Sequence, residues 1–419
     1  MKKVLIINYN FLDDFIGSVR MRGLAKYLPL YNWEPIILTN KVNCSNLNRP
    51  ICNIVETEYD DLICEWKKIF KLDAKASVTE QLGIQVKQEK NTLVETLISL
   101  WDQIFAYPDI NKGWIRYAVK EGDAILSNKQ FDAIISSSPP ATAHIIGRQI
   151  SLNNHVPWIA DLRDPWVPYN IKHGSIRKYF DRRLQYRTLK DAACLVTISE
   201  PLSNQLKWIS NNVRVITNGF ENAVSYPSAR NDKLRIVYTG YIYKNKQDPE
   251  PLFQAIHELV NECLININDI QVDLYGKNIE IVKDEVLKYN LENIVNFNGF
   301  ISREESLKIQ RAAQILLLLT WNDKNERGVY TGKLFDYLAA RRPILAVGNY
   351  KDEAAMLVEK VDVGRQASSV EDIKKELIKY YNEYKANGTI AYKCNDNTLG
   401  KYSLKEMARK YAEILNMIL

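Results

Sequence analysis

Short runs of β-branched and aliphatic residues recur along the whole chain, and amphipathic stretches separate them. This alternation is typical of parallel sheets whose strands are joined by crossover helices. The first series of runs comprises residues 4–8, 35–38, 133–136, 158–160, 195–198 and 214–216. The second series comprises residues 235–239, 272–275, 294–297, 315–319 and 344–347. Because 419 residues exceed what one hydrophobic core usually holds, the pattern predicts an α/β protein with two doubly wound units.

A polar stretch at 218–232 separates the two series. We therefore expect an N-terminal Rossmann-like domain at 1–220 and a C-terminal one at 233–400. An amphipathic helix should follow within 401–419, where apolar residues recur at helical spacing. A long insertion at about 56–129 interrupts the first series with helical patterns.

Six apolar residues of this insertion fall on one helical stripe. They are Leu93, Leu97, Leu100, Trp101, Ile104 and Phe105. The stripe indicates either packing into the core or a face for a lipid-linked acceptor or a membrane surface.

Composition excludes several classes of protein. With 46% hydrophobic and 25% charged residues, the chain is neither disordered nor fibrous, and a net charge of +6 is too small to indicate nucleic-acid binding. The six cysteines lack metal-ligand spacing, which predicts reduced thiols in a cytoplasmic protein. The apolar run that ends before Asn8 is too short for a secretion signal, and residues 315–319 are far too few to span a membrane.

A glycine turn at Gly17 follows the first strand and opens a helix that should run to about Leu30. Glycine lets a ligand approach the backbone, and a helix start offers free N–H groups to a phosphate. Arg20 and Arg22 lie beside the turn and favour an anion site over a plain strand-to-helix connection. We therefore count Gly17 and Arg20 as candidate donor-binding residues.

The stretch 158–166 ends a buried-looking strand in two aspartates, one arginine and a second tryptophan. Ligands of doubly wound sheets bind outside the carboxyl ends of strands, so these side chains lie where binding residues are expected. Asp161 is the candidate catalytic residue, which would position or deprotonate an acceptor hydroxyl. The alternative is that Arg163 forms an ion pair that stiffens the loop.

In the second unit, Gly240 follows the first strand and Lys246 comes a few residues later, where a lysine can neutralise a pyrophosphate. Thr331, Gly332 and Lys333 begin a helix whose N-terminus can also hold phosphate. Asp336 follows one turn later and can accept hydrogen bonds from two ribose hydroxyls at once.

In order and spacing, these motifs resemble the family-four-like GT-B glycosyltransferases, especially the bacterial surface-polysaccharide branch. The resemblance rests on Gly17 and on residues 137–141, 158–166, 197–201, 218–220 and 328–343. It implies two Rossmann-like domains facing a central cleft, with the acceptor on the N-terminal side and the nucleotide-sugar on the C-terminal side. It also implies that the last helix crosses back to the first domain.

The family carries two acidic residues eight positions apart, of which the first contacts the donor sugar and the second binds ribose. Asp336 stands at the second position, whereas Gly328 stands at the first and has no side chain; Glu326 is a possible substitute. Tyr330 lies in the same block and joins the candidate donor-binding residues. The family's phosphate-binding lysine is matched by Lys246.

Tyr241 replaces the arginine that partners this lysine in the family. Arg20, Arg327 or Lys333 would then supply the missing charge.

The resemblance implies a retaining, hexosyltransferase-like enzyme that uses a nucleotide-sugar as substrate without metal or other cofactor. The absence of an Asp-x-Asp triplet in the sequence fits this expectation. The acceptor would be a glycan or a lipid-linked sugar in surface polysaccharide synthesis. Two alternatives remain open: a GT-B-shaped nucleotide-sugar epimerase, which needs no acceptor, and a non-catalytic partner subunit that lost its first acid at Gly328.

A basic segment between Lys172 and Lys190 contains seven lysine and arginine residues and only one acid, Asp181. Such a cluster favours contact with an anionic membrane surface, and a solvated basic helix is the alternative. We therefore expect a cytoplasmic protein that docks peripherally on the inner face of the membrane.

Overall fold

The computed structural model describes residues 1–12, 17–42, 52–61, 107–128, 130–167, 174–221, 232–321, 328, 330–348 and 352–419. The chain divides into two compact units. Unit 1 comprises Met1–Ile216 and Ala408–Leu419, and unit 2 comprises Thr217–Met407. The predicted boundary lay in the polar stretch that begins at Asn218, just beyond Ile216.

Unit 1 is built on a parallel sheet of seven described strands in the order β3-β2-β1-β4-β5-β6-β7. The strands are β1 (Lys2–Ile7), β2 (Trp33–Asn40), β3 (Asn53–Thr57), β4 (Ala133–Ser138), β5 (Trp158–Leu162), β6 (Cys194–Thr197) and β7 (Val213–Val215). The order runs outward in both directions from β1 and β4, which is the doubly wound arrangement. Polar side chains at the carboxyl ends of β1, β4 and β5 therefore meet at one edge of the sheet.

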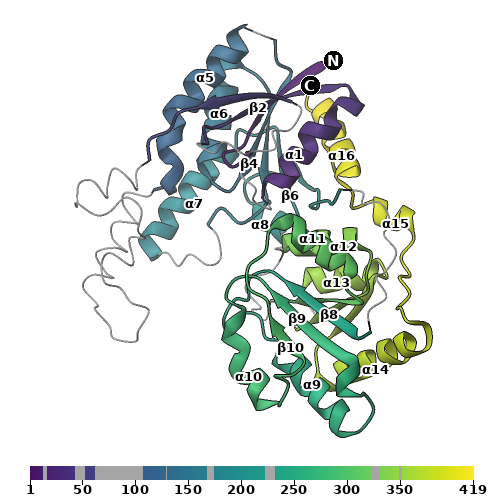
Figure 1. Ribbon diagram of the computed structural model, residues 1–419. Helices are drawn as coiled ribbons and strands as arrows, with labels where there is room; N and C mark the ends of the chain where they lie inside the picture. The colour runs from purple at the N-terminus through teal and green to yellow at the C-terminus, as the bar shows by residue number, and fades with distance from the viewer. Residues whose placement is uncertain are drawn as a thin grey trace. The chain divides into compact units, whose positions relative to one another are not determined.

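Helices cover both faces of this sheet. They are α1 (Ser18–Tyr27), α5 (Ile115–Asn128), α6 (Thr142–Asn154), α7 (Ser175–Leu189), α8 (Glu200–Leu206) and α16 (Leu404–Met417). Figure 1 shows α5 and α6 across the sheet from α1 and α16. Leu5 and Ile7 of β1 pack with Ala118 of α5 and Ile146 of α6, because alternate residues of a strand point to the same face.

Unit 2 repeats the design, with six described strands in the order β10-β9-β8-β11-β12-β13. The strands are β8 (Leu234–Thr239), β9 (Ile270–Tyr275), β10 (Val295–Phe297), β11 (Ile315–Leu319), β12 (Ile344–Val347) and β13 (Gly364–Ala367). The helices are α9 (Glu250–Asn261), α10 (Lys283–Lys288), α11 (Arg303–Ala312), α12 (Gly332–Ala340), α13 (Glu353–Lys360), α14 (Val370–Asn387) and α15 (Asp396–Gly400). One core joins the sheet to α9 and α14, and a second joins its other face to α12 and α13.

The prediction of two doubly wound units is confirmed, and two edge strands were missed. β3 is only half-buried and has a weak apolar pattern, and β13 reads Gly-Arg-Gln-Ala. Both are defined by parallel pairing with β2 and β12 respectively. Gly364 allows this pairing, since a Cβ there would clash with the Ile344 backbone.

Part of the sequence analysis concerns residues outside those described. The apolar stripe from Leu93 to Phe105 lies outside them, as do Lys172, Glu326 and Arg327. None of the described helices combines the length and the apolar character that crossing a bilayer requires.

Candidate functional site

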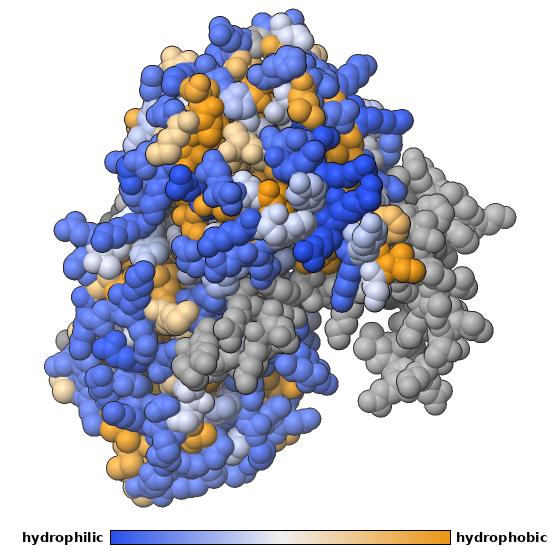
Figure 2. Space-filling model, turned by 180° about the vertical axis from the view of Figure 1, so that it is seen from behind, coloured by the Kyte–Doolittle hydropathy of each residue, from blue (hydrophilic) through white to orange (hydrophobic). Residues whose placement is uncertain are grey.

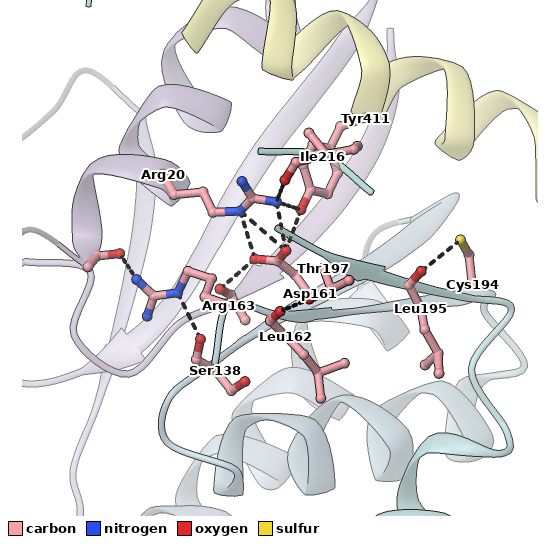
Figure 3. Close-up of polar contacts among 12 residues, drawn as sticks. Arg20, Ser138, Asp161, Leu162, Arg163, Cys194, Leu195, Thr197, Ile216 and Tyr411 are labelled. Carbon is pink, nitrogen blue, oxygen red and sulfur yellow. Dashed lines mark hydrogen bonds and ion pairs between the residues drawn. The ribbon is translucent and has the colours of Figure 1, made fainter. Parts of the chain in front are cut away.

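A buried polar cluster in unit 1 contains two of the predicted site residues. Arg20 projects from α1 toward Asp161 in β5, and the two side chains are 2% and 0% exposed. The Arg20 guanidinium donates to Asp161 Oδ1 at 2.9 Å and to Oδ2 at 3.1 Å (Figure 3). Tyr411 from α16 donates its hydroxyl to Asp161 Oδ1 at 2.6 Å and accepts from Arg20 at 2.8 Å. Ser137 completes the contacts by donating to Asp161 Oδ2 at 2.8 Å.

The charges of this cluster stabilise each other. Burial by itself raises the pKa of the Asp161 carboxyl, but the Arg20 guanidinium and its hydrogen bonds outweigh burial and hold that pKa below its ordinary value. Burial likewise raises the pKa of the Tyr411 hydroxyl, which stays protonated. Asp161 is therefore an ionised carboxylate that serves as the counter-ion of Arg20.

This arrangement gives Asp161 and Arg20 partners within the protein. The donor-binding role of Arg20 and the catalytic role of Asp161 both stay predictions. Arg163 does not pair with a neighbouring aspartate; it donates to the backbone carbonyls of Ser138, at 2.7 Å, and Gly17. Gly17 has φ of −65°, so the turn does not depend on the conformational freedom of glycine.

Two buried polar groups near this edge were missed by the sequence analysis. Asn8 follows β1 and is 1% exposed, and its amide has no hydrogen-bond partner among the described residues. His144 shares a 2.7 Å hydrogen bond with Ser136 through Nδ1, while its buried Nε2 has no described partner. The signal for Asn8 was available, since a polar residue directly after a buried strand lies where ligands of such sheets bind.

Unit 2 brings Gly240 and Lys333 together at the carboxyl ends of its strands. The Lys333 amino group, in the first turn of α12, donates to the Tyr238 hydroxyl at 2.6 Å and lies 4.2 Å from the centre of that ring. Gly240 has φ of +134°, and a Cβ there would come within 2.9 Å of Lys333 Nζ. Only glycine fits this position.

Burial lowers the pKa of the Lys333 amino group to about 7. The physical cause is loss of water around an ammonium group whose hydrogen-bond acceptor is a neutral phenol. An anion placed beside this group would restore its charge. A phosphate is such an anion, and the N-terminus of α12 offers backbone N–H groups to it.

Asp336 lies one turn beyond Lys333 on α12 and forms a two-pronged ion pair with Arg303 of α11. Arg303 donates to the two carboxylate oxygens at 3.0 and 2.7 Å, and the Asp336 side chain is 14% exposed. Burial raises the pKa of Asp336, and Arg303 opposes that shift. Sequence analysis missed Arg303, because a helix-capping pattern at Ser302 and Glu305 marks the start of α11 but nothing local links it to α12.

The rest of the Gly328–Lys333 block surrounds the start of α12. Gly328 has φ of +91°, a conformation that a glutamate would adopt only with strain, and its N–H donates to Glu353 at 3.0 Å. Thr331 precedes α12, and its buried hydroxyl has no described partner. The Tyr330 ring packs edge-on against Phe335 at 6.0 Å.

Lys246 lies on the loop after β8, and its amino group is 5.0 Å from the centre of the Trp321 ring. The structure thus groups Gly240, Lys333 and the α12 start, and it places Lys246 beside an aromatic side chain. The described residues contain no cluster of three histidine, cysteine or acidic side chains positioned to hold a metal ion.

No protein-family model matches the chain, and no curated protein matches it. Solved structures do match. The chain is similar to HepE of Anabaena in complex with UDP, with a TM-score of 0.64, 13% identity and 100% of each chain covered. Sucrose-phosphate synthase of Thermosynechococcus elongatus gives a TM-score of 0.62 and 14% identity, covering 100% of this chain and 99% of the other. TarM of S. aureus, in complex with UDP and glycan ligands, gives 0.56 and 11%, covering 99% of this chain and all of TarM.

At these identities the similarity shows the fold, and the two parallel-sheet units have the GT-B fold.

Proposed function

We propose that this protein is a glycosyltransferase that moves a sugar from a nucleotide-sugar donor to a glycan or lipid-linked acceptor. The observation that carries the proposal is the enclosed Lys333 amino group beside Gly240 at the start of α12. HepE, which has the same fold, was solved with UDP and with UDP-glucose, and these complexes support a nucleotide-sugar as the donor.

The proposed reaction needs positive charge at the leaving diphosphate. The bond between the anomeric carbon and the diphosphate oxygen breaks, the acceptor hydroxyl oxygen bonds to the same face of that carbon, and the hydroxyl proton is released. Lys333, Lys246 and the N–H groups at the start of α12 would stabilise the charge that develops on the diphosphate. With these groups in place, the proposal includes retention of configuration and no metal ion.

Asp336 is the proposed ribose-binding residue. Its two oxygens already accept from Arg303, and each oxygen keeps a further lone pair that a ribose hydroxyl can reach. Arg303 would then keep the carboxylate ionised and oriented while the ribose binds.

Binding of nucleoside diphosphates to variants tests the site. We expect Lys333→Ala and Lys246→Ala each to weaken binding by about 1.5–3 kcal/mol, the value of a hydrogen bond to a charged group. Asp336→Asn should weaken binding while the melting temperature without nucleotide stays unchanged. Lys244→Ala is the matched control, since Lys244 is exposed on the same loop. Equal affinity for parent, Lys333→Ala and Lys246→Ala would reject the site.

Donor hydrolysis and transfer, measured with and without glycan acceptors, separate this function from its alternatives. A transferase forms a glycosylated product only when an acceptor is present. An epimerase interconverts the donor sugar alone, and a non-catalytic subunit does neither. A role in surface polysaccharide synthesis would follow from the acceptor that supports transfer.

The proposal also includes docking on an anionic membrane surface through α7. Five basic residues of α7 and its end are exposed: Lys178, Arg182, Arg183, Arg187 and Lys190. The only acid of the helix, Asp181, is 3% exposed and pairs with Arg177 at 3.0 Å. The exposed surface of α7 therefore carries positive charge alone.

Large apolar side chains accompany this charge. Ile176, Tyr179 and Phe180 are 78%, 61% and 49% exposed, and Tyr186 stacks on the exposed Trp208 ring at 5.8 Å. Figure 2 shows hydrophobic side chains interleaved with strongly hydrophilic ones on one face of the molecule. Apolar side chains among basic ones suit the interface of an anionic bilayer, where each basic residue contributes about 1 kcal/mol.

Sedimentation with liposomes tests the α7 surface. We expect binding to vesicles that contain anionic lipid, less binding to neutral vesicles, and release as salt rises. The triple variant Lys178→Glu/Arg183→Glu/Arg187→Glu should stay in the supernatant. Lys360→Glu/Lys375→Glu/Lys401→Glu makes the same charge change on unit 2 and should bind as the parent does. Equal recovery of the parent with anionic and neutral vesicles at low salt would exclude docking.

A further inference from the structure

We propose that the rings of Tyr241, Tyr243 and Trp321 form the subsite that holds the glycosyl ring of the nucleotide-sugar, by stacking against its C–H face. We call these three side chains the ring subsite. The inference rests on the proposed function and adds the residues that would recognise the transferred sugar.

The three rings form one continuous group. The Tyr241 and Tyr243 ring centres are 4.6 Å apart, and the Tyr243 and Trp321 centres are 5.0 Å apart. Tyr241 is 44% exposed and Tyr243 is 46% exposed, although each carries a large apolar surface. Keeping such surface in water is unfavourable, and clustered exposed rings are a feature of binding sites.

The sheet order explains why residues distant in sequence meet here. Tyr241 and Tyr243 follow β8, Trp321 follows β11, and these two strands are neighbours in the sheet. Both segments therefore leave the sheet at its carboxyl edge, where ligands of doubly wound domains bind.

The loop that carries the two tyrosines is fixed from both sides. Gln247 donates to the Leu319 carbonyl at 2.8 Å and accepts from the Tyr243 N–H at 3.3 Å, which attaches the loop to the end of β11. The Tyr238 hydroxyl donates to the Tyr241 carbonyl at 2.8 Å. Because the loop is held before any ligand arrives, less ordering entropy is lost on binding.

A chain of contacts links the ring subsite to the proposed diphosphate and ribose positions. Asp336 and Lys333 lie one turn apart on α12, Lys333 bonds to Tyr238, and Tyr238 bonds to the Tyr241 backbone. At the other end of the group, Lys246 lies 5.0 Å from the centre of the Trp321 ring. The order ribose, diphosphate, glycosyl in a nucleotide-sugar corresponds to the order Asp336, Lys333, ring subsite.

The chemistry of the rings suits a sugar. One face of a hexose ring presents C–H groups, which are apolar and slightly positive, whereas the face of an aromatic ring is negative. Stacking buries both apolar surfaces and leaves the sugar hydroxyls free at the rim. Such a contact also compensates for Gly328, which cannot contact the sugar as an acidic side chain would.

Calorimetric titration of the full chain tests the inference. The nucleotide is first chosen by binding of UDP, GDP, ADP and dTDP, and the probes are then that nucleoside diphosphate and its glucose, galactose and N-acetylglucosamine derivatives. We expect Tyr243→Ala to weaken the preferred nucleotide-sugar about tenfold while leaving the bare diphosphate unchanged. Tyr241→Ala should act in the same direction, and Tyr243→Phe should restore sugar binding.

Phe300→Ala is the matched control, since Phe300 is an exposed ring of unit 2 with Lys277 beside it. This variant should keep the ratio of the two affinities. A tenfold loss for the diphosphate as well as for the nucleotide-sugar in Tyr243→Ala would mean that the rings contact the base, which overturns the inference. Unchanged affinity for both probes would also overturn it. If none of the four diphosphates binds the parent, it is the proposed function that fails.

Discussion

Among the single residues, Lys333 has the most unusual chemical environment. Its folded-state pKa of about 7 lies below the ordinary value of 10.5, so at pH values above about 7 the empty site holds a neutral amine. The unfolded chain binds more protons than the folded one between these two values, and stability therefore rises with pH across that window. Below pH 7 both states are charged, and the folded protein bears the full penalty of a buried ammonium.

The same shift predicts how ligand binding depends on pH. A diphosphate would raise the pKa of Lys333, so binding takes up a proton at pH values above about 7 and affinity should fall as pH rises from 7 to 9. Calorimetry with a nucleotide-sugar at several pH values measures this slope. In Lys333→Arg the side chain stays charged, so the slope should disappear. A parent affinity that is constant over this range would contradict the prediction.

Asp161 has two possible roles that a substitution can separate. We expect Asp161→Asn to reduce the free energy of unfolding by about 3–5 kcal/mol, because Arg20 would remain buried without a counter-ion. Urea unfolding measures this loss. A variant with parental stability and a lower kcat would instead support the predicted part in acceptor activation.

On the scale of elements, α16 links the end of the chain to unit 1. The Tyr411 hydroxyl joins Asp161 and Arg20, and both bonds involve a charged group. Tyr411→Phe should therefore destabilise the protein by about 1.5–3 kcal/mol, measured by urea unfolding. Tyr392→Phe is the control, since the buried Tyr392 hydroxyl has no described partner and its removal should cost nothing. Equal stability of both variants would show that the Tyr411 bonds contribute little.

Sequence patterns predicted the buried strands well, because a strand covered on both faces reads as a continuous apolar run. Residues 235–239 and 315–319 are examples, as β8 and β11 occupy them within one residue. Edge strands lack this signal. β13 contains arginine and glutamine, and its pairing with β12 alone makes it a strand.

On the scale of the whole molecule, the chain repeats one plan twice. Each sheet begins its numbering at the centre and grows outward, so the first strand of each unit delivers its glycine or polar residue to the same edge as the later strands. This is why Gly240 and Lys333 meet although they are far apart in sequence. It also explains why site residues were correctly sought directly after strands.

The sequence by itself determined the α/β class, the two repeated units and the short-range spacing of Lys333 and Asp336, because these depend on local periodicity and on one helical turn. Tertiary structure decided the partners of the charged residues. Arg303 lies 33 positions from Asp336, Arg20 lies 141 from Asp161, and Tyr411 lies 250 from Asp161. A buried charge is stable only beside its counter-charge, and which segments supply that counter-charge depends on how strands and helices pack.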